Sequence, residues 1–137
     1  MPDLIVPTLD ISDVSVYYGH KCAVENVSFN AHSGHIYGII GNNGCGKTSL
    51  MKAVMNLTGH NGICRLNGKT LEKMSVKKRA RLISYIPQKT GINISMTVRE
   101  VCLLGFNPRL RIFESYSSNM RQQVDKAIDS VGLAGLY

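Results

Sequence analysis

A glycine-rich loop constrains this sequence more than any other feature. Residues 41–48 read Gly-Asn-Asn-Gly-Cys-Gly-Lys-Thr and fit the pattern G-x-x-x-x-G-K-[ST] at every fixed position. The apolar run 35–40 (HIYGII) precedes the loop and predicts a buried strand. Residues 47–57 follow it with apolar side chains at helical spacing. Because the pattern follows a predicted strand and opens a predicted helix, it predicts a phosphate-binding loop.

The residue types in the loop suit a nucleoside triphosphate with Mg²⁺. Glycines let successive backbone N–H groups turn toward phosphate oxygens, and the start of the helix adds positive potential. Lys47 is expected to contact the β and γ phosphates and to serve catalysis, while Thr48 offers a hydroxyl to Mg²⁺. The predicted nucleotide-binding set is Gly41, Asn42, Asn43, Gly44, Cys45, Gly46, Lys47, Thr48 and Ser49.

Cys45 has two interpretations. It is a plain small residue, or it is a thiol acidified by the helix N-terminus and modifiable when nucleotide is absent. The chain has four cysteines and none is paired as C-x-x-C. The sequence therefore predicts neither a zinc site nor a disulfide framework.

The rest of the chain alternates short strands and helices. Strands are predicted at 11–18, 23–31, 63–66 and 82–86, with an Asn67-Gly68 hairpin turn after the third. Helices are predicted at 76–82 and at 120–131, the second with Gly132 as its C-terminal cap. A further helix is predicted to begin at the capping box Thr97-Val98-Arg99-Glu100. This mixture within one unit indicates an α/β or α+β class.

The bulk composition is that of one cytoplasmic globular domain. The 137 residues suit one domain at most, and no apolar run approaches the length of a membrane helix. No signal-peptide pattern opens the chain. The net charge of +7 is concentrated in the run Lys77-Lys78-Arg79-Ala80-Arg81. Such runs are usually a solvated helix face, and no aromatic platform accompanies this one, so no nucleic-acid partner is expected.

The residues around the loop resemble the nucleotide-binding domain of ABC transporters. Tyr18-Gly19 resembles the A-loop, whose aromatic ring stacks on adenine. Residues 26–29 (NVSF), with 34–41 (GHIYGIIG), are similar to the run into that family's Walker A loop. Residues 83–88 (ISYIPQ) resemble the strand that ends in the Q-loop glutamine, here Gln88.

The resemblance implies an α/β P-loop NTPase fold of the ABC ATPase type. Its parts would be an N-terminal antiparallel β subdomain, the first part of the RecA-like core and the start of the helical subdomain. It implies ATP and Mg²⁺ as cofactors, Tyr18 against adenine, and Gln88 near Mg²⁺ and the attacking water. It also implies transmembrane permease subunits and a second ATPase subunit as partners, with a homodimer in the full-length form. The protein would be a peripheral subunit on the inner face of the plasma membrane.

The segment 97–110 narrows the resemblance to importers of iron–siderophore, haem and cobalamin complexes. Those proteins commonly carry Leu-Gly-Arg-x-Pro, where this chain has Leu104-Gly105-Phe106-Asn107-Pro108. Phe106 thus replaces the arginine of that pattern. The sequence-based hypothesis is an ATPase subunit coupled to uptake of an iron chelate or similar metal complex.

The resemblance spans residues 9–137 and covers only part of the family's domain. The signature Leu-Ser-Gly-Gly-Gln, the Walker B strand and the switch histidine do not occur in the sequence. Without the Walker B glutamate we expect ATP binding with little unaided turnover. We also expect the strands at 35–40 and 82–86 to lack their usual neighbour. Three alternatives stay open: an importer ATPase subunit, a module that binds ATP without hydrolysing it, or a nonfunctional remnant.

Overall fold

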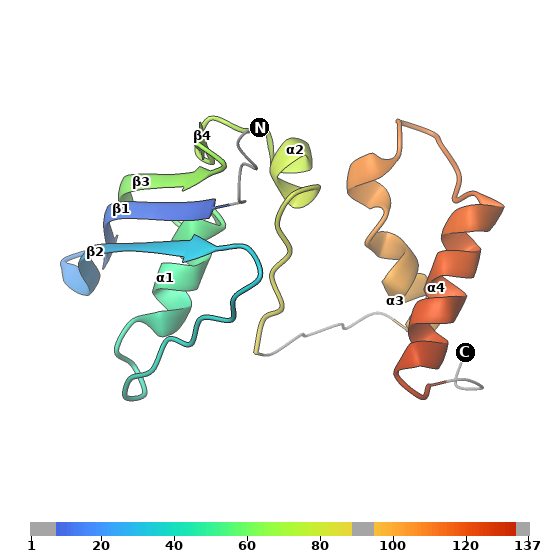
Figure 1. Cartoon of the computed structure of the whole chain (residues 1–137), viewed down its shortest axis with the longest axis horizontal. Coiled ribbons are helices and arrows are strands. Elements are labelled where there is room, and N and C mark those ends of the chain that lie inside the picture. Colours follow the sequence, from blue (N-terminus) through green and yellow to red (C-terminus); the bar gives the residue numbers. More distant parts are fainter. Residues whose placement is uncertain (1–7, 89–94, 134–137) are drawn as a thin grey trace, which may run out of the picture. The chain divides into compact units, whose positions relative to one another are not determined.

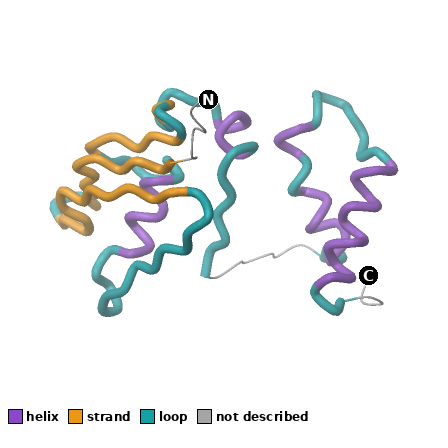
Figure 2. The backbone as a smooth tube through the Cα atoms, in the orientation of Figure 1, coloured by secondary structure: helices purple, strands orange, loops and turns teal. Residues whose placement is uncertain are grey.

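The computed structural model describes residues 8–88 and 95–133. The chain divides into two compact units, Met1–Ser75 and Val76–Tyr137. Figure 1 shows a twisted sheet with one helix in the first unit and a group of helices in the second. The backbone view in Figure 2 shows that all strands belong to the first unit.

The first unit is built on an antiparallel sheet with the strand order β2-β1-β3-β4 (Figure 1). Its strands are β1 (Thr8–Tyr18), β2 (Lys21–His32), β3 (Asn61–Leu66) and β4 (Lys69–Thr70). The Asn67-Gly68 turn joins β3 to β4, and both residues have positive φ, 51° and 72°. Two such residues form the turn whose twist matches a hairpin, so the predicted hairpin is confirmed.

The helix α1 (Lys47–Val54) covers one face of this sheet. Leu50, Ala53 and Val54 are its buried residues, and they belong to the same core as apolar residues of the strands. α1 ends earlier than the predicted 57 because Asn56 adopts a left-handed conformation, with φ 50°. The core residues of this unit are Ile11, Val14, Val16, Val24, Leu50, Ala53, Val54, Cys64 and Leu71.

The second unit contains α2 (Val76–Ala80), α3 (Val98–Leu104), the 3₁₀ turn η1 (Asn107–Arg109) and α4 (Ser118–Ser130). α3 and α4 pack together through Leu103, Val124 and Ile128, with Phe106 and Tyr116 against them. Both predicted caps are confirmed. Thr97 and Glu100 form a reciprocal capping box at the start of α3, and Gly132 follows α4 with a φ of 73°.

Two predicted strands are wrong. Residues 35–40 and 82–86 run as irregular chain, and Ile36, Ile40 and Ile86 are 102, 96 and 90% exposed. An apolar run becomes a strand only when a neighbouring strand accepts and donates its backbone hydrogen bonds. Within residues 8–88 and 95–133 no strand pairs with either segment. These two segments therefore lack a neighbouring strand, as expected, and for that reason they do not form strands.

None of the helices in the described part of the chain is long and apolar enough to cross a membrane.

Candidate nucleotide-binding site

The glycine loop is fixed against the sheet at Gly46. This residue is the N-cap of α1 and has a left-handed φ of 96°. A Cβ at this position would lie 2.0 Å from the carbonyl oxygen of Ala23 and 3.0 Å from Val24 Cγ2. Only glycine fits such a close approach to β2. The first unit therefore positions the loop through direct backbone contact.

Glycine also suits the first and middle positions of the loop. A Cβ on Gly41 would lie 2.6 Å from the Cys45 sulfur. Gly44 has φ 82°, and the N–H of Cys45 donates to the Asn42 carbonyl oxygen at 3.3 Å. The loop thus closes into a tight turn that carries little side-chain bulk, which is the shape a chain of phosphates needs.

Lys47 folds back over this turn. Its Nζ donates to the carbonyl oxygens of Gly41 and Asn42, each at 2.7 Å, and lies 3.7 Å from the Cys45 sulfur. The ammonium group is therefore held at the loop although Lys47 is only half-buried. A positive charge in this place suits an anion bound along the loop.

The N-terminus of α1 adds to the positive electrostatic potential at the loop. Gly46 offers no side-chain cap, and the first turn holds no acidic residue. The N–H groups of Lys47, Thr48 and Ser49 have no acceptor within the helix, so they are free to bind an anion. Thr48 is exposed in the first turn of α1, and its contact with Mg²⁺ stays a prediction. The residues present fit a triphosphate with its metal ion.

Tyr18, the predicted adenine platform, lies beside α1. It is 48% exposed at the end of β1. Hydrogen bonds from Ser49 and then Thr58 lower the pKa of the Tyr18 phenol. The structure therefore brings Tyr18 together with Ser49 of the predicted binding set. Stacking on adenine stays a prediction.

Gln88 is an exposed residue of the second unit. It directly precedes residues 89–94, which lie outside the described part of the chain. Its predicted contacts with Mg²⁺ and water therefore stay a prediction.

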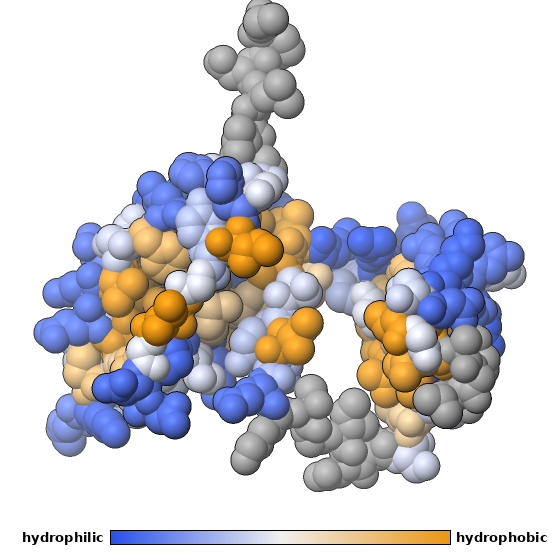
Figure 3. Space-filling view, turned by 60° about the horizontal axis from the view of Figure 1, so that its bottom comes forward, coloured by the Kyte–Doolittle hydropathy of each residue, from blue (hydrophilic) through white to orange (hydrophobic). Residues whose placement is uncertain are grey.

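A hollow of about 460 Å³ lies next to the loop. Its walls are mostly apolar and come from β2, the irregular segment and α1, including Val24, Val27, Ile39, Ile40 and Leu50. Cys45 and Lys47 form its edge toward the loop. Figure 3 shows hydrophobic residues at the surface of this unit, in agreement with the exposed isoleucines. Because its walls are apolar, this hollow does not suit phosphate binding.

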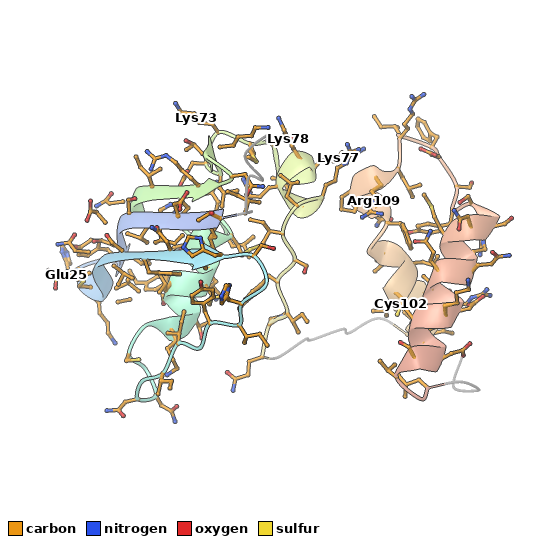
Figure 4. All side chains as sticks on the ribbon, viewed as in Figure 1. Glu25, Lys73, Lys77, Lys78, Cys102 and Arg109 are labelled. Atoms are coloured by element: carbon orange, nitrogen blue, oxygen red, sulfur yellow. The ribbon has the colours of Figure 1, made fainter. Side chains whose placement is uncertain are left out.

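The basic run 77–81 makes contacts within the second unit. Arg81 Nε donates to the carbonyl oxygen of Pro108 at 2.7 Å, and Lys77 Nζ donates to that of Leu110. Arg79 is only 6% exposed. In Figure 4 the Lys77 side chain extends from α2 toward the segment around η1. The run is therefore solvent-exposed, as such runs usually are, except at Arg79, and Lys77 and Arg81 also bind the segment at the end of η1.

One cluster of side chains has no recognised sequence motif, because its cysteine is not paired as C-x-x-C. His60, Cys64 and Glu72 place nitrogen, sulfur and oxygen atoms within 4.8 Å of one another. Glu72 follows β4 and reaches this place only because the hairpin folds it back beside β3. The available signal was a histidine four residues before a cysteine.

Comparison with known proteins decides the family. Residues 24–137 match the family described as ABC transporter. This chain belongs to that family. The ABC ATPase fold, with the phosphate loop after an antiparallel β subdomain, is thus confirmed for the N-terminal part of the domain. The family binds ATP with Mg²⁺ and hydrolyses ATP.

Curated relatives agree with this assignment. The chain is 30% identical, over 93% of its length, to the manganese transport system ATP-binding protein MntB of Halalkalibacterium halodurans. It is 30% identical to the iron(3+)-hydroxamate import ATP-binding protein FhuC of Bacillus subtilis, over 93% of its length. It is 32% identical to the hemin import ATP-binding protein HmuV of a Chelativorans strain, over 93% of its length. The chain spans about half of each relative, 50, 48 and 47%.

A solved structure supports the fold. The chain superimposes on a metal-chelate type ABC transporter in an inward-facing conformation with a TM-score of 0.71 and 20% identity. The match covers 95% of this chain and 46% of the other. An identity this low supports the fold alone.

Proposed function

We propose that this chain is the ATP-binding part of an importer ATPase subunit that powers uptake of an iron chelate or similar metal complex. The observation that carries the proposal is the folded phosphate loop. Gly46 fits only as glycine against the Ala23 carbonyl, and Lys47 is held over the loop. The relatives are ATP-binding proteins of manganese, iron(3+)-hydroxamate and hemin transport systems, which supports a metal complex as the transported substrate.

Within this proposal each part of the site has one role. Gly41, Asn42, Asn43, Gly44, Cys45 and Gly46 surround the phosphates with backbone N–H groups. Lys47 neutralises charge on the β and γ phosphates, and Ser49 extends the set at the helix start. Thr48 and Gln88 ligate Mg²⁺ with oxygen atoms, and Gln88 also orients water. Tyr18 stacks on the adenine.

The assembly proposed for this chain follows from the family. Residues 9–137 would form part of a nucleotide-binding domain that carries the Walker A loop and the Q-loop. The partners would be transmembrane permease subunits and, in the full-length form, a second copy of the ATPase subunit. The subunit would sit on the cytoplasmic face of the membrane.

A second candidate function is ATP binding without hydrolysis. Lys47, held over the loop by the carbonyl oxygens of Gly41 and Asn42, can bind and neutralise phosphates without any part in positioning water. Hydrolysis needs a positioned water as well as charge stabilisation on the phosphates. The loop alone supplies the second requirement and not the first.

Turnover and association separate the two candidates. We expect the 137-residue chain to show little steady-state release of phosphate from Mg-ATP by itself. Robust turnover that Lys47→Ala abolishes and Lys69→Ala leaves intact would contradict binding without hydrolysis. Lys69 is a suitable control because it is an exposed lysine on β4, outside the loop. Co-purification with a membrane permease would support the importer proposal, and its absence from native membranes would oppose it.

A further inference from the structure

Three side chains with metal-binding atoms converge beside the sheet, outside the nucleotide site. Cys64 belongs to β3 and is fully buried. His60 directly precedes β3, and its side chain is 2% exposed. Glu72 follows β4 and points back to both. The sulfur of Cys64 and the Nε2 of His60 are 4.0 Å apart.

The orientation of His60 matches that of a metal ligand. Its Nδ1 lies 3.2 Å from the carbonyl oxygen of Thr58. A carbonyl oxygen only accepts, so Nδ1 carries the hydrogen and donates it. Nε2 faces Glu72 Oε1, 2.9 Å away, which also only accepts, so without a metal ion this contact needs a second hydrogen on the imidazole, and a bound cation would take the place of that hydrogen. Metal-binding histidines are commonly held in this way, with the second nitrogen donating to a backbone carbonyl.

The carboxylate of Glu72 lacks a full set of partners. Its Oε1 accepts a hydrogen bond from the backbone N–H of Cys64 at 2.8 Å and faces His60 Nε2. Its Oε2 is buried and has no hydrogen-bond partner among the described residues. An unpartnered carboxylate oxygen away from water is costly. A bound cation would satisfy it.

We propose that His60, Cys64 and Glu72 form a binding site for a Zn²⁺-class transition-metal ion. Imidazole, thiolate and carboxylate are the donors that Zn²⁺ takes, whereas Mg²⁺ and Ca²⁺ take oxygen alone. This site is separate from the nucleotide site and does not depend on the proposed function.

The spacing of the three side chains suits such an ion. Zn²⁺ binds nitrogen and oxygen at about 2.1 Å and sulfur at about 2.3 Å, which places tetrahedral ligand atoms roughly 3.3–3.8 Å apart. The observed separations of 2.9 Å between His60 and Glu72 and 4.0 Å between His60 and Cys64 bracket this range. Small side-chain rotations therefore complete the geometry.

The cluster borders a hollow at His60. This hollow of about 210 Å³ is lined by Ser15, Tyr17, Gly59, His60 and Asn61. Three protein ligands leave a fourth tetrahedral position for water. A metal ion that binds the Cys64 sulfur displaces the thiol proton to solvent as the metal–sulfur bond forms.

A cobalt titration tests the proposal. The chain would carry Cys22→Ser, Cys45→Ser and Cys102→Ser, so that Cys64 is its one remaining thiol. We expect Co²⁺ to bind with one-to-one stoichiometry and to produce a thiolate-to-metal charge-transfer absorption. Zn²⁺ should abolish this absorption by displacing Co²⁺. Absence of the absorption in a chain whose circular dichroism shows the native fold would overturn the proposal.

Single substitutions test the ligand set. His60→Gln and Glu72→Gln should each weaken Zn²⁺ binding at least ~10-fold in calorimetry, since each removes a ligand. His20→Gln and Glu25→Gln serve as matched controls because both residues are exposed and distant from the cluster in sequence. Cys64→Ser should remove the cobalt absorption. If Cys64→Ser does not fold, His60→Gln decides, and unchanged affinity in His60→Gln overturns the proposal.

Discussion

Gly46 carries two constraints at once, one conformational and one steric. Its φ of 96° lies in the left-handed region, and an added Cβ would lie 2.0 Å from the Ala23 carbonyl oxygen. Gly34 shares the first constraint, with φ 81°, but has open space where a Cβ would be. Substitutions at Gly46 and Gly34 therefore separate the free-energy cost of a left-handed backbone conformation from that of a steric clash.

We predict that Gly46→Ala destabilises the chain by about 2–5 kcal/mol and that Gly34→Ala costs only ~1–2 kcal/mol. The larger effect arises because the loop must move away from β2. Chemical denaturation of both variants measures the difference. Equal destabilisation would mean that the contact between the loop and β2 is absent in solution.

Cys45 reports on occupation of the loop. Its thiol is exposed and lies 3.7 Å from Lys47 Nζ. If phosphates bind along the loop, saturating Mg-ATP should slow alkylation of Cys45 severalfold, because the bound nucleotide covers it. Cys102 is exposed on α3 in the other unit and should react at the same rate throughout. Mass spectrometry of the alkylated peptides gives both rates, and an unchanged Cys45 rate would contradict the binding proposal.

At the scale of elements, the capping box of α3 gives a pH-dependent prediction. Hydrogen bonds from the Thr97 backbone, and then from its hydroxyl, lower the pKa of Glu100 below its ordinary 4.5. A lowered carboxyl pKa stabilises the folded state above the unfolded value, and this contribution is lost as pH falls through the folded pKa. Glu100→Gln should therefore be less stable than the native chain near neutral pH, with a difference that begins to shrink near pH 4.5 and vanishes once the pH has fallen through the lower pKa of the folded state.

Thermal unfolding across that pH range measures this effect. Ser117→Ala is the control, because Ser117 caps α4 through Met120 N–H without a carboxylate. It should lower stability by about 1 kcal/mol at every pH. A Glu100→Gln effect that is equally independent of pH would contradict the role assigned to the charge.

The elements that the sequence predicts correctly are those whose causes are local. Turn residues fix the Asn67-Gly68 hairpin, and a cap with its partner fixes α3. The segments 35–40 and 82–86 fail because a buried strand depends on a neighbour that no local pattern reveals. The phosphate loop is predictable since glycine positions encode its backbone. The cluster of His60, Cys64 and Glu72 is not, because a hairpin brings its members together.

At the scale of the whole chain, apolar residues of two irregular segments are exposed. Ile36, Ile40 and Ile86 lie almost fully in solvent. Such surface favours association with other chains. A ligand that binds the folded chain opposes this tendency, since a concentration of one thousand times the dissociation constant adds about 4 kcal/mol. Nucleotide binding is thus central to both the function and the stability proposed for this chain.

Isothermal titration calorimetry of the chain with Mg-ATP tests the central claim most directly. We predict one site per chain in the native sequence, with binding lost in Lys47→Ala and retained in Lys69→Ala, because only Lys47 lies at the loop. No heat of binding to a folded native chain, or equal affinity in Lys47→Ala, would contradict the account.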